Sequence, residues 1–333
     1  MHTLENASGL IVRLSGFGAR IVEVHAPDRH GDLADIALGL ESEEAYEHDT
    51  AYLGCIAGRC CNRIAEGRFC LDGREFRLPI NNGPNHLHGG VRGFDRHAWH
   101  AERVEAEHGA SIRFSRVSPD GEEGYPGELR ASVAYTLTEA NRLIIAMEAT
   151  TDTPTLCNLT QHAYWNLAGH DSGSILGHVV HLDASRYTPV NGSMIPTGAI
   201  EPVAGTAFDF TRAKPIGRDL ATLGGDPPGY DHNFVVDGDP GSLRPVARVL
   251  EPRSGRVLEL LANQPGVQFY TGNFLEGSSR GKRGARYGRH AGFCLETQCF
   301  PDAVNKPGWI APVLRPGQVY RHLMEFRFGT DRG

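Results

Sequence analysis

Turn signals recur along the whole chain and divide it into short apolar segments. Asp or Asn followed by Gly, a pair that favours tight hairpin turns, occurs at 72–73, 82–83, 120–121, 191–192 and 237–238. The chain also contains 41 glycines and 20 prolines. Strand-like segments of about four to eight residues lie between the turns. This pattern predicts an all-β protein, a large antiparallel β-sandwich with few short helices.

Two segments, 41–48 and 213–223, are the candidate helices. The 333 residues exceed the usual size of one domain, but β-sandwiches often run long as a single unit. Because no repeat, linker or low-complexity tract interrupts the chain, we expect residues 1–333 to form a single domain.

Charge and apolar content exclude several classes of partner. The net charge of -7 and the pI near 6.1 argue against nucleic acid or an anionic membrane as the main partner. No apolar run approaches the roughly 18 residues of a membrane span. The first residues lack the pattern of a signal peptide, so a cytoplasmic location is expected.

Two further features are read as structural rather than functional. The seven cysteines show no Cys-x-x-Cys spacing, which indicates reduced thiols rather than disulfides or a zinc site. The one locally basic run, 280–289, is rich in glycine, and we expect a mobile, solvated loop there.

Segment 158–168 carries the densest row of hydrogen-bonding side chains. In an extended conformation, alternate side chains lie on the same face. The polar face then consists of Thr160, His162, Tyr164 and Asn166. Leu159 and Trp165, on the other face, would anchor the strand in a core. The segment is therefore either a surface strand with a solvated face or one wall of a polar cleft.

A long loop is expected between Gly58 and Phe94, because this stretch has many Gly, Asn and His residues and few apolar ones. Within it, Arg63 offers a fork of donors, and His88 offers a ring nitrogen beside two glycines. His86 and His88 alone suggest a metal, but no third ligand occurs at a usual spacing, so no metal is expected.

Three later segments add polar candidates. Asp231 follows a Pro-Pro-Gly turn where a loop enters a strand, and an Asp there is commonly a turn former. Alternation places Gln268 opposite Val267 and Phe269, and Glu296 opposite Phe293 and Leu295. A Glu among Phe, Leu and Cys is expected to be partly buried, and a buried carboxylate needs a partner or a chemical role.

Together these motifs resemble the aldose 1-epimerases, the galactose mutarotases, from about Gly18 to Phe328. The resemblance rests on Asn62-Arg63, 85–90 with Gly93-Phe94-Asp95, 162–167, 230–234, 266–274, and 295–298 followed by 301–305. It implies the mutarotase-type supersandwich with an open cleft, and interconversion of the α and β anomers of free aldohexoses such as glucose and galactose, without cofactor or metal. It also implies the roles of eight residues: His162 as acid, Glu296 as base, and Asn62, Arg63, His88, Tyr164, Asp231 and Gln268 as ligands of sugar hydroxyls.

The chemistry agrees with this resemblance. Ring opening requires a base for the C1 hydroxyl proton and an acid for the ring oxygen, and a carboxylate and an imidazole can hold opposite protonation states near neutral pH. We expect nearby carboxylate charge to favour protonated His162. Three alternatives remain: a non-catalytic sugar-binding protein, a hydrolase that uses Glu296 with Asp231, and an epimerase for hexose phosphates. The preferred aldose, and whether the protein is a monomer or a homodimer, stay open.

Overall fold

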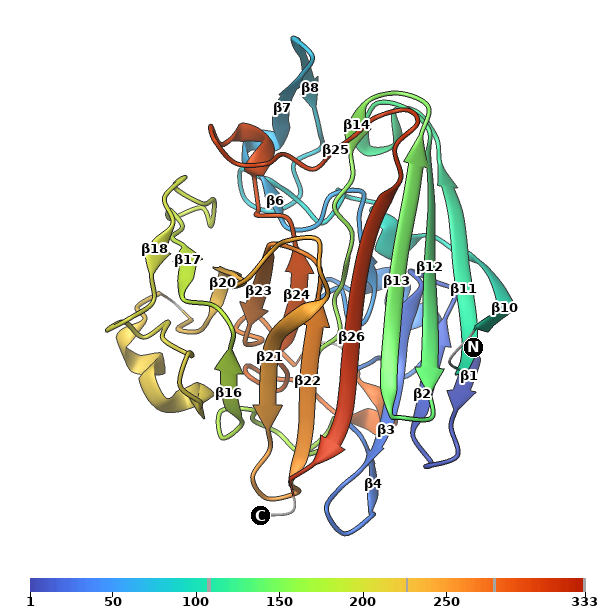
Figure 1. Ribbon diagram of the computed structural model, residues 1–333, viewed down its shortest axis with the longest axis vertical. Coiled ribbons are helices and arrows are strands. Elements are labelled where there is room, and N and C mark those ends of the chain that lie inside the picture. The colour runs from blue at the N-terminus through green and yellow to red at the C-terminus, as the bar shows by residue number, and fades with distance from the viewer. Residues whose placement is uncertain (107–108, 226, 278–279, 332–333) are drawn as a thin grey trace.

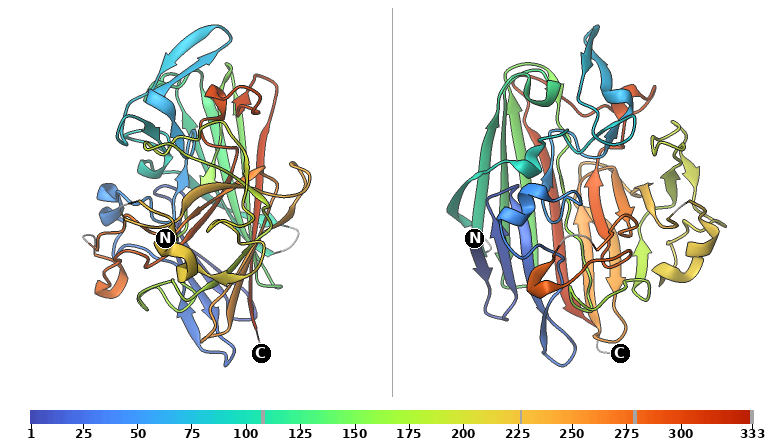
Figure 2. Two further views of the ribbon diagram at one scale, coloured as in Figure 1. Left: turned by 90° about the vertical axis from the view of Figure 1, so that its left-hand side faces the viewer. Right: turned by 180° about the vertical axis from the view of Figure 1, so that it is seen from behind.

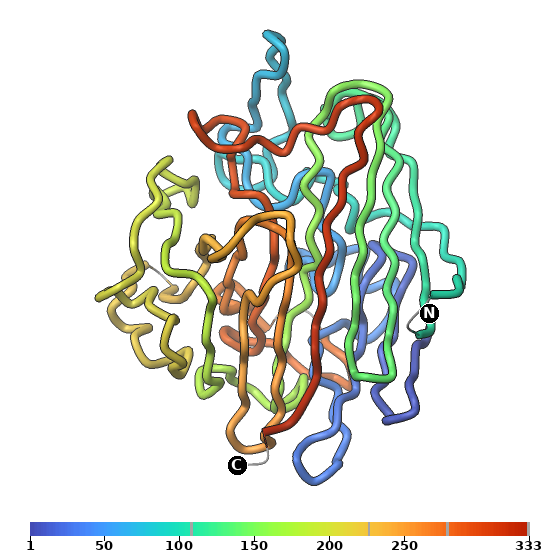
Figure 3. The backbone as a smooth tube through the Cα atoms, viewed as in Figure 1, coloured from blue at the N-terminus to red at the C-terminus, as the bar shows by residue number. Residues whose placement is uncertain are grey.

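The computed structural model describes residues 1–106, 109–225, 227–277 and 280–331. Its largest element is a nine-stranded antiparallel sheet (Figure 1). In spatial order its strands are β10 (His100–Ala106), β11 (Gly109–Ser118), β12 (Leu129–Thr138), β13 (Arg142–Thr151), β26 (Tyr320–Thr330), β22 (Arg256–Ala262), β21 (Arg244–Leu250), β16 (Val179–Leu182) and β19 (Lys214–Pro215). The tube in Figure 3 shows β26 in the middle of this sheet, between β13 and β22.

Two smaller antiparallel sheets cover one face of the large sheet, as the reversed view of Figure 2 shows. The first has the order β1 (His2–Glu5), β2 (Ile11–Ser15), β3 (Arg20–Pro27), β4 (Leu33–Asp35). The second has the order β18 (Glu201–Pro202), β17 (Arg186–Thr188), β20 (Asp231–Val235), β23 (Gly266–Tyr270), β24 (Cys294–Gln298). One continuous cluster of buried apolar side chains fills the space between the layers. The predicted all-β antiparallel sandwich is thus confirmed.

Short ladders and 3₁₀ turns complete the architecture. The two-stranded ladders are β5 (Ile56–Ala57) with β15 (Thr160–Gln161), β6 (Arg63–Ile64) with β9 (His86–Leu87), β7 (Arg68–Leu71) with β8 (Arg74–Arg77), and β14 (Thr155–Leu156) with β25 (Val313–Leu314). The 3₁₀ turns are η1 (Glu44–His48), η2 (Ala65–Gly67), η3 (Phe94–Arg96), η4 (Glu122–Gly124), η5 (Ile216–Thr222), η6 (Lys282–Gly284) and η7 (Ala303–Asn305). The two predicted helical segments, 41–48 and 213–223, are helical only in part: each contains a short 3₁₀ helix, η1 and η5, and the second begins with strand β19. Among the residues described, no helix has the length and apolar character needed to cross a membrane.

The basic segment 280–289 differs from the prediction of a solvated loop. Its four arginines are exposed, as expected, but Lys282 is buried. The Lys282 ammonium donates hydrogen bonds to the Asp35 carboxylate and to the carbonyl oxygens of Val22 and Ala37. The prediction was wrong at this lysine because Asp35 lies far away in the sequence, so local composition carries no sign of the ion pair.

Replacing Lys282 with alanine is expected to destabilise the fold by about 3 kcal/mol, because it leaves the Asp35 carboxylate buried without its cation. Urea unfolding measures the loss, and Arg283→Ala, an exposed cation one residue away, is the control, with an expected change within about 0.5 kcal/mol. A loss below about 1 kcal/mol for Lys282→Ala would mean that the backbone donors to Asp35 are sufficient.

Candidate active site

A cavity of about 480 Å³ opens between the five-stranded sheet and the loops beside it. It contains seven of the eight predicted site residues: Asn62, Arg63, His88, His162, Tyr164, Asp231 and Glu296. A larger hollow, of about 600 Å³, lies on the nine-stranded sheet, where Arg116, Arg130 and Arg321 are paired with glutamates. Buried titratable groups gather only in the smaller of these two cavities, so we place the candidate site there.

Strand register brings the two carboxylates of this site, Asp231 and Glu296, to one face of the sheet. Asp231 shares its face of β20 with Asn233, two residues further on. Asn233 is paired with Gln268 on β23, which in turn is paired with Glu296 on β24. Val267, Phe269 and Leu295 point the other way, into the core. The alternation predicted for both segments is therefore confirmed, and so is the burial of Glu296, whose exposed fraction is 2%.

Segment 158–168 forms less strand than predicted, since only Thr160 and Gln161 belong to a ladder. His162 is held by its backbone N–H, which donates to the carbonyl oxygen of Cys55 at 2.8 Å. His162 and Tyr164 line the cavity, as the polar face predicts. Thr160 and Asn166 do not, and the Asn166 amide instead donates to the carbonyl oxygens of Gly173 and Ala291. The irregular backbone after Gln161 breaks the alternation on which the prediction depended.

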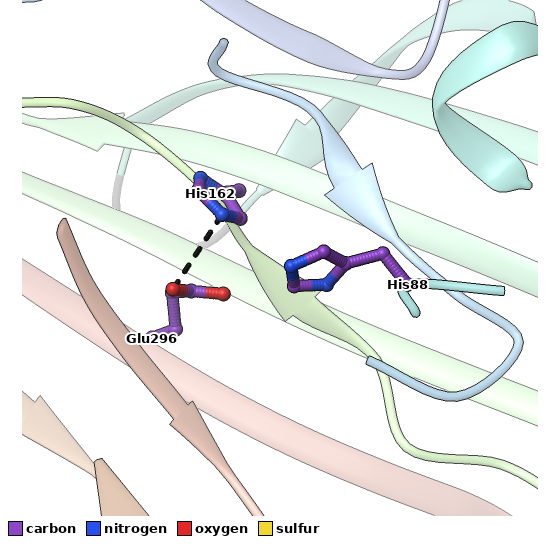
Figure 4. Close-up of side chains that lie close together, drawn as sticks. All are labelled: His88, His162 and Glu296. Atoms are coloured by element: carbon purple, nitrogen blue, oxygen red, sulfur yellow. Dashed lines mark ion pairs between the residues drawn. The ribbon is translucent and has the colours of Figure 1, made fainter. Parts of the chain in front are cut away.

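His162 and Glu296 face each other across 3.5 Å, measured from Nε2 to Oε1 (Figure 4). The other carboxyl oxygen of Glu296, Oε2, is buried and has no hydrogen-bond partner within the described part of the chain. A buried carboxyl oxygen without a partner is costly in a folded protein and is typical of a group that waits for a ligand.

Burial controls the protonation of this pair. It lowers the pKa of His162 to about 4, against the opposing pull of the Asp231 carboxylate. Burial also raises the pKa of Glu296 well above its ordinary value; the charge of Asp231 adds to this rise, and Arg63 opposes it. The charge of Asp231 favours protonated His162, as expected, but desolvation of the ring outweighs it, so the protonated ring is not the favoured form. Both shifts favour the uncharged forms, an unprotonated His162 ring and a protonated Glu296 carboxyl group.

Arg63 and Asp231 form a polar cluster at the cavity wall. The Arg63 Nε donates to the Asn82 side-chain oxygen at 3.0 Å, and its Nη2 lies 3.7 Å from Asp231 Oδ2. The Gln268 amide donates to Asp231 Oδ1 at 2.6 Å and accepts from the Gln298 amide at 3.3 Å. Gln268 is the one predicted site residue that does not line the cavity; it lies behind Asp231.

His88 has a fixed tautomer. Its Nδ1 accepts a hydrogen bond from the backbone N–H of Asn62 at 3.1 Å, so the neutral ring carries its proton on Nε2. Burial lowers the pKa of His88 well below its usual range; the charge that His162 would carry if protonated and the charge of Arg63 act in the same direction. This histidine is therefore a neutral hydrogen-bond donor.

Three potential metal ligands meet in the cavity, because ligand atoms of His88, His162 and Glu296 lie within 4.8 Å of one another. Of the two histidines that suggested a metal in the sequence, only His88 belongs to this group; the other two members come from distant segments, where sequence spacing gives no sign of them. A metal on Nε2 of His88 would move the ring proton to Nδ1, where it would face the Asn62 N–H. The hydrogen bond from Asn62 therefore disfavours a metal here.

Several cavity residues were not predicted from sequence. They include Tyr52, Asn82, Met194, Tyr270 and Phe274. The Tyr52 ring lies 4.6 Å from that of His88, centroid to centroid. The sequence pattern at Asn82 indicates only a turn, and the Arg63 that it supports is distant in sequence. Only Tyr270 carried a local signal, since it shares a strand face with Gln268.

Comparison with known proteins agrees with this geometry. The family model described as aldose 1-epimerase matches residues 1–327. The galactose mutarotase of Bos taurus is 47% identical over 321 residues, covering 96% of this chain and 92% of its own length. The aldose 1-epimerase of Escherichia coli K12 is 37% identical over 333 residues, covering 98% and 94%. The solved structure of an aldose epimerase homologue from C. elegans superposes with a TM-score of 0.90, at 32% identity and 98% coverage of each chain. With the fold, the cavity and these relatives in agreement, the chain belongs to the aldose 1-epimerase family.

Proposed function

We propose that the cavity converts the α and β anomers of free aldohexoses, glucose and galactose among them, by acid–base ring opening and closure, and that the protein is thus an isomerase. The observation that carries this proposal is the pair of Glu296 and His162, 3.5 Å apart, with one Glu296 oxygen buried and unpartnered within the described structure. Ring opening needs one proton acceptor and one proton donor, and a carboxyl group beside an imidazole can supply both.

Turnover begins with the proton on Glu296, and sugar binding moves it. Hydroxyl groups that donate to Glu296 stabilise the carboxylate, so the proton passes across the 3.5 Å gap to His162 Nε2. Glu296 then takes the C1 hydroxyl proton while His162 protonates the ring oxygen. After rotation about the C1–C2 bond, the two groups exchange roles and the ring closes on the other carbonyl face. Each turnover returns the pair to its starting proton count.

Sugar hydroxyls are held by the groups around the pair. Asp231 accepts and Arg63 donates, side by side at 3.7 Å. His88 donates from Nε2, because Asn62 occupies its other nitrogen. Tyr164 presents its ring, since its hydroxyl already donates to the Ala51 carbonyl oxygen at 2.8 Å. These contacts keep the ring oxygen near His162 while the C1–C2 bond rotates.

Gln268→Leu is expected to raise KM for galactose about tenfold and to change kcat less than about threefold. Gln268 does not reach the cavity, so its loss acts only through the orientation of Asp231, which is worth about one charge-assisted hydrogen bond. Initial rates over a range of sugar concentrations separate the two constants. Loss of kcat with KM unchanged would instead connect Gln268 to Glu296, its cross-strand neighbour.

The acid limb of the pH profile is expected near pH 4, because burial lowers the pKa of His162 to about 4. Below this pH both His162 and Glu296 are protonated, no proton acceptor remains, and kcat/KM falls. Above it the pair holds one proton and activity persists until Glu296 loses its proton. Polarimetric rates between about pH 3.5 and 9, with circular dichroism to confirm folding, provide the measurement. An acid limb near pH 6.5, the pKa of an exposed imidazole, would mean that the cavity does not desolvate His162.

Polarimetry of freshly dissolved α-D-glucose and α-D-galactose, corrected for spontaneous mutarotation, tests the function itself. The protein is expected to accelerate the approach to anomeric equilibrium of both sugars.

The same protein is expected to leave glycosides intact, because Asp231, the second carboxylate that a hydrolase would use, is bound to Gln268 and Arg63. Hexose phosphates are expected to be poor substrates, since Arg63 is the only Lys or Arg side chain among the described cavity residues. No acceleration with a folded protein would favour a sugar-binding protein instead.

A further inference from the structure

The catalytic imidazole has a second nitrogen that ring opening does not use. Nε2 of His162 faces Glu296, while Nδ1 points away from that carboxyl group and lies 3.6 Å from the sulfur of Cys294. Sulfur is larger than oxygen, so a hydrogen bond of this length is ordinary for a thiol. Cys294 and Glu296 are two residues apart on β24 and therefore project from the same face of the strand. One strand thus contacts both nitrogens of the imidazole.

No other residue in the described part of the chain forms a hydrogen bond with the His162 ring. His88, Tyr164 and Tyr52 surround it with ring centroids at 5.0, 5.1 and 6.0 Å, which are contacts between rings rather than hydrogen bonds. The charges that act on it are those of Asp231 and Arg20. The orientation and the tautomer of His162 therefore depend on Cys294 at one nitrogen and Glu296 at the other.

We propose that Cys294 is a positioning residue for mutarotation: its sulfur accepts a hydrogen bond from Nδ1–H of His162 and so holds the Nε2 lone pair toward Glu296. This inference rests on the acid–base pair of the proposed function. The opposite arrangement, in which the thiol donates to Nδ1, would put the ring proton on Nε2, facing the protonated Glu296 carboxyl. Nε2 would then already carry a hydrogen, so it could take no proton from Glu296.

A thiol suits this position because it orients the ring without adding charge. Cys294 is fully buried, and burial raises the pKa of its thiol well above the ordinary value, so the group stays neutral. Thiol sulfur is also a weak acceptor. A carboxylate in its place would stabilise the imidazolium and hold the proton on His162. With sulfur, the proton remains free to move between Glu296 and His162.

The tautomer of His162 in the unmodified protein provides the direct test. Nitrogen-15 NMR of labelled protein at neutral pH, with the His162 signals assigned by their loss in His162→Gln, reports which nitrogen carries the proton. The expected result is a protonated Nδ1 and an unprotonated Nε2 in the sugar-free protein. A protonated Nε2 with a bare Nδ1 would overturn the proposal. This measurement needs no variant at Cys294, and its outcome does not depend on mutarotase activity, so it distinguishes failure of this inference from failure of the proposed function.

Substitutions test the effect on rate. Cys294→Ala removes the acceptor and is expected to lower kcat about tenfold, a part of the general acid–base contribution, with KM changed less than about twofold. Cys294→Ser keeps a hydroxyl at the same place and is expected to recover kcat to within about threefold of the parent. Cys157→Ala, which truncates another buried thiol beside a different cavity, is the matched control and is expected to leave kcat unchanged. An equal loss of kcat in Cys294→Ala and Cys157→Ala, or no loss in either, would overturn the proposal.

Discussion

Glutamine at position 296 is expected to lower kcat for the mutarotation of glucose and galactose by about 10³-fold, or about 4 kcal/mol of activation free energy. The amide has nearly the shape of the carboxyl group but cannot accept a proton or deliver one. KM is expected to change less than about threefold, because the hydroxyl-binding groups around the pair are untouched. Polarimetric initial rates, with sugar binding measured by calorimetry, separate the two effects.

The stability of Glu296→Gln provides an internal control. Oε2 of Glu296 is buried without a partner in the described structure, and burial raises the pKa of this carboxyl group, so folding at neutral pH works against its ionised form, whereas an amide has no charge to lose. The melting temperature is therefore expected to stay equal or to rise. Glu148→Gln, at a half-exposed glutamate on the nine-stranded sheet, is the control for substitution as such and should keep full activity. More than about a tenth of the parent rate in Glu296→Gln would exclude Glu296 as the base.

His162→Ala is expected to lower kcat at least about 10²-fold, because Glu296 then has no partner with which to exchange its proton. Since the two groups act as one unit, the double variant His162→Ala with Glu296→Gln should be less than about tenfold slower than the slower single variant. The same polarimetric assay measures all three proteins.

A multiplicative loss of kcat in the double variant would contradict this prediction. If the two single effects multiply in the double variant, His162 and Glu296 act independently, and a proton shared between them is excluded. His170→Ala serves as the matched control, because this buried histidine bonds to Tyr287 and lies outside the cavity. It is expected to change stability but not kcat.

Strand alternation made part of the site predictable. In segments 266–270 and 294–298, the apolar residues had to face a core, so the sequence alone assigns Gln268 and Glu296 to the opposite face. The same rule failed after Gln161, where the chain leaves its ladder and Asn166 turns to backbone carbonyl oxygens. Alternation is informative only where a partner strand holds the backbone extended.

Loop residues were harder to predict, because their conformations depend on distant contacts. Tyr52, Asn62, His88 and Met194 line the cavity with φ angles of 58°, 57°, 51° and 63°, a left-handed conformation that side chains other than Gly adopt at a cost. The sequence around Tyr52 and Met194 gives no sign of this left-handed conformation. Protonation was missed for a related reason: the pKa of His162 depends on how completely the assembled cavity excludes water, which sequence does not report.

The central position of β26 has a consequence for how the protein is made. This strand joins β13, from the first half of the chain, to β22, from the second, so the large sheet stays in two pieces without it. The ribosome makes residues 320–330 after every other strand of that sheet. Until they emerge from the ribosome, β13 and β22 each present an unpaired edge, and such edges recruit other strands. Chaperone demand during synthesis should therefore fall sharply once these eleven residues are released.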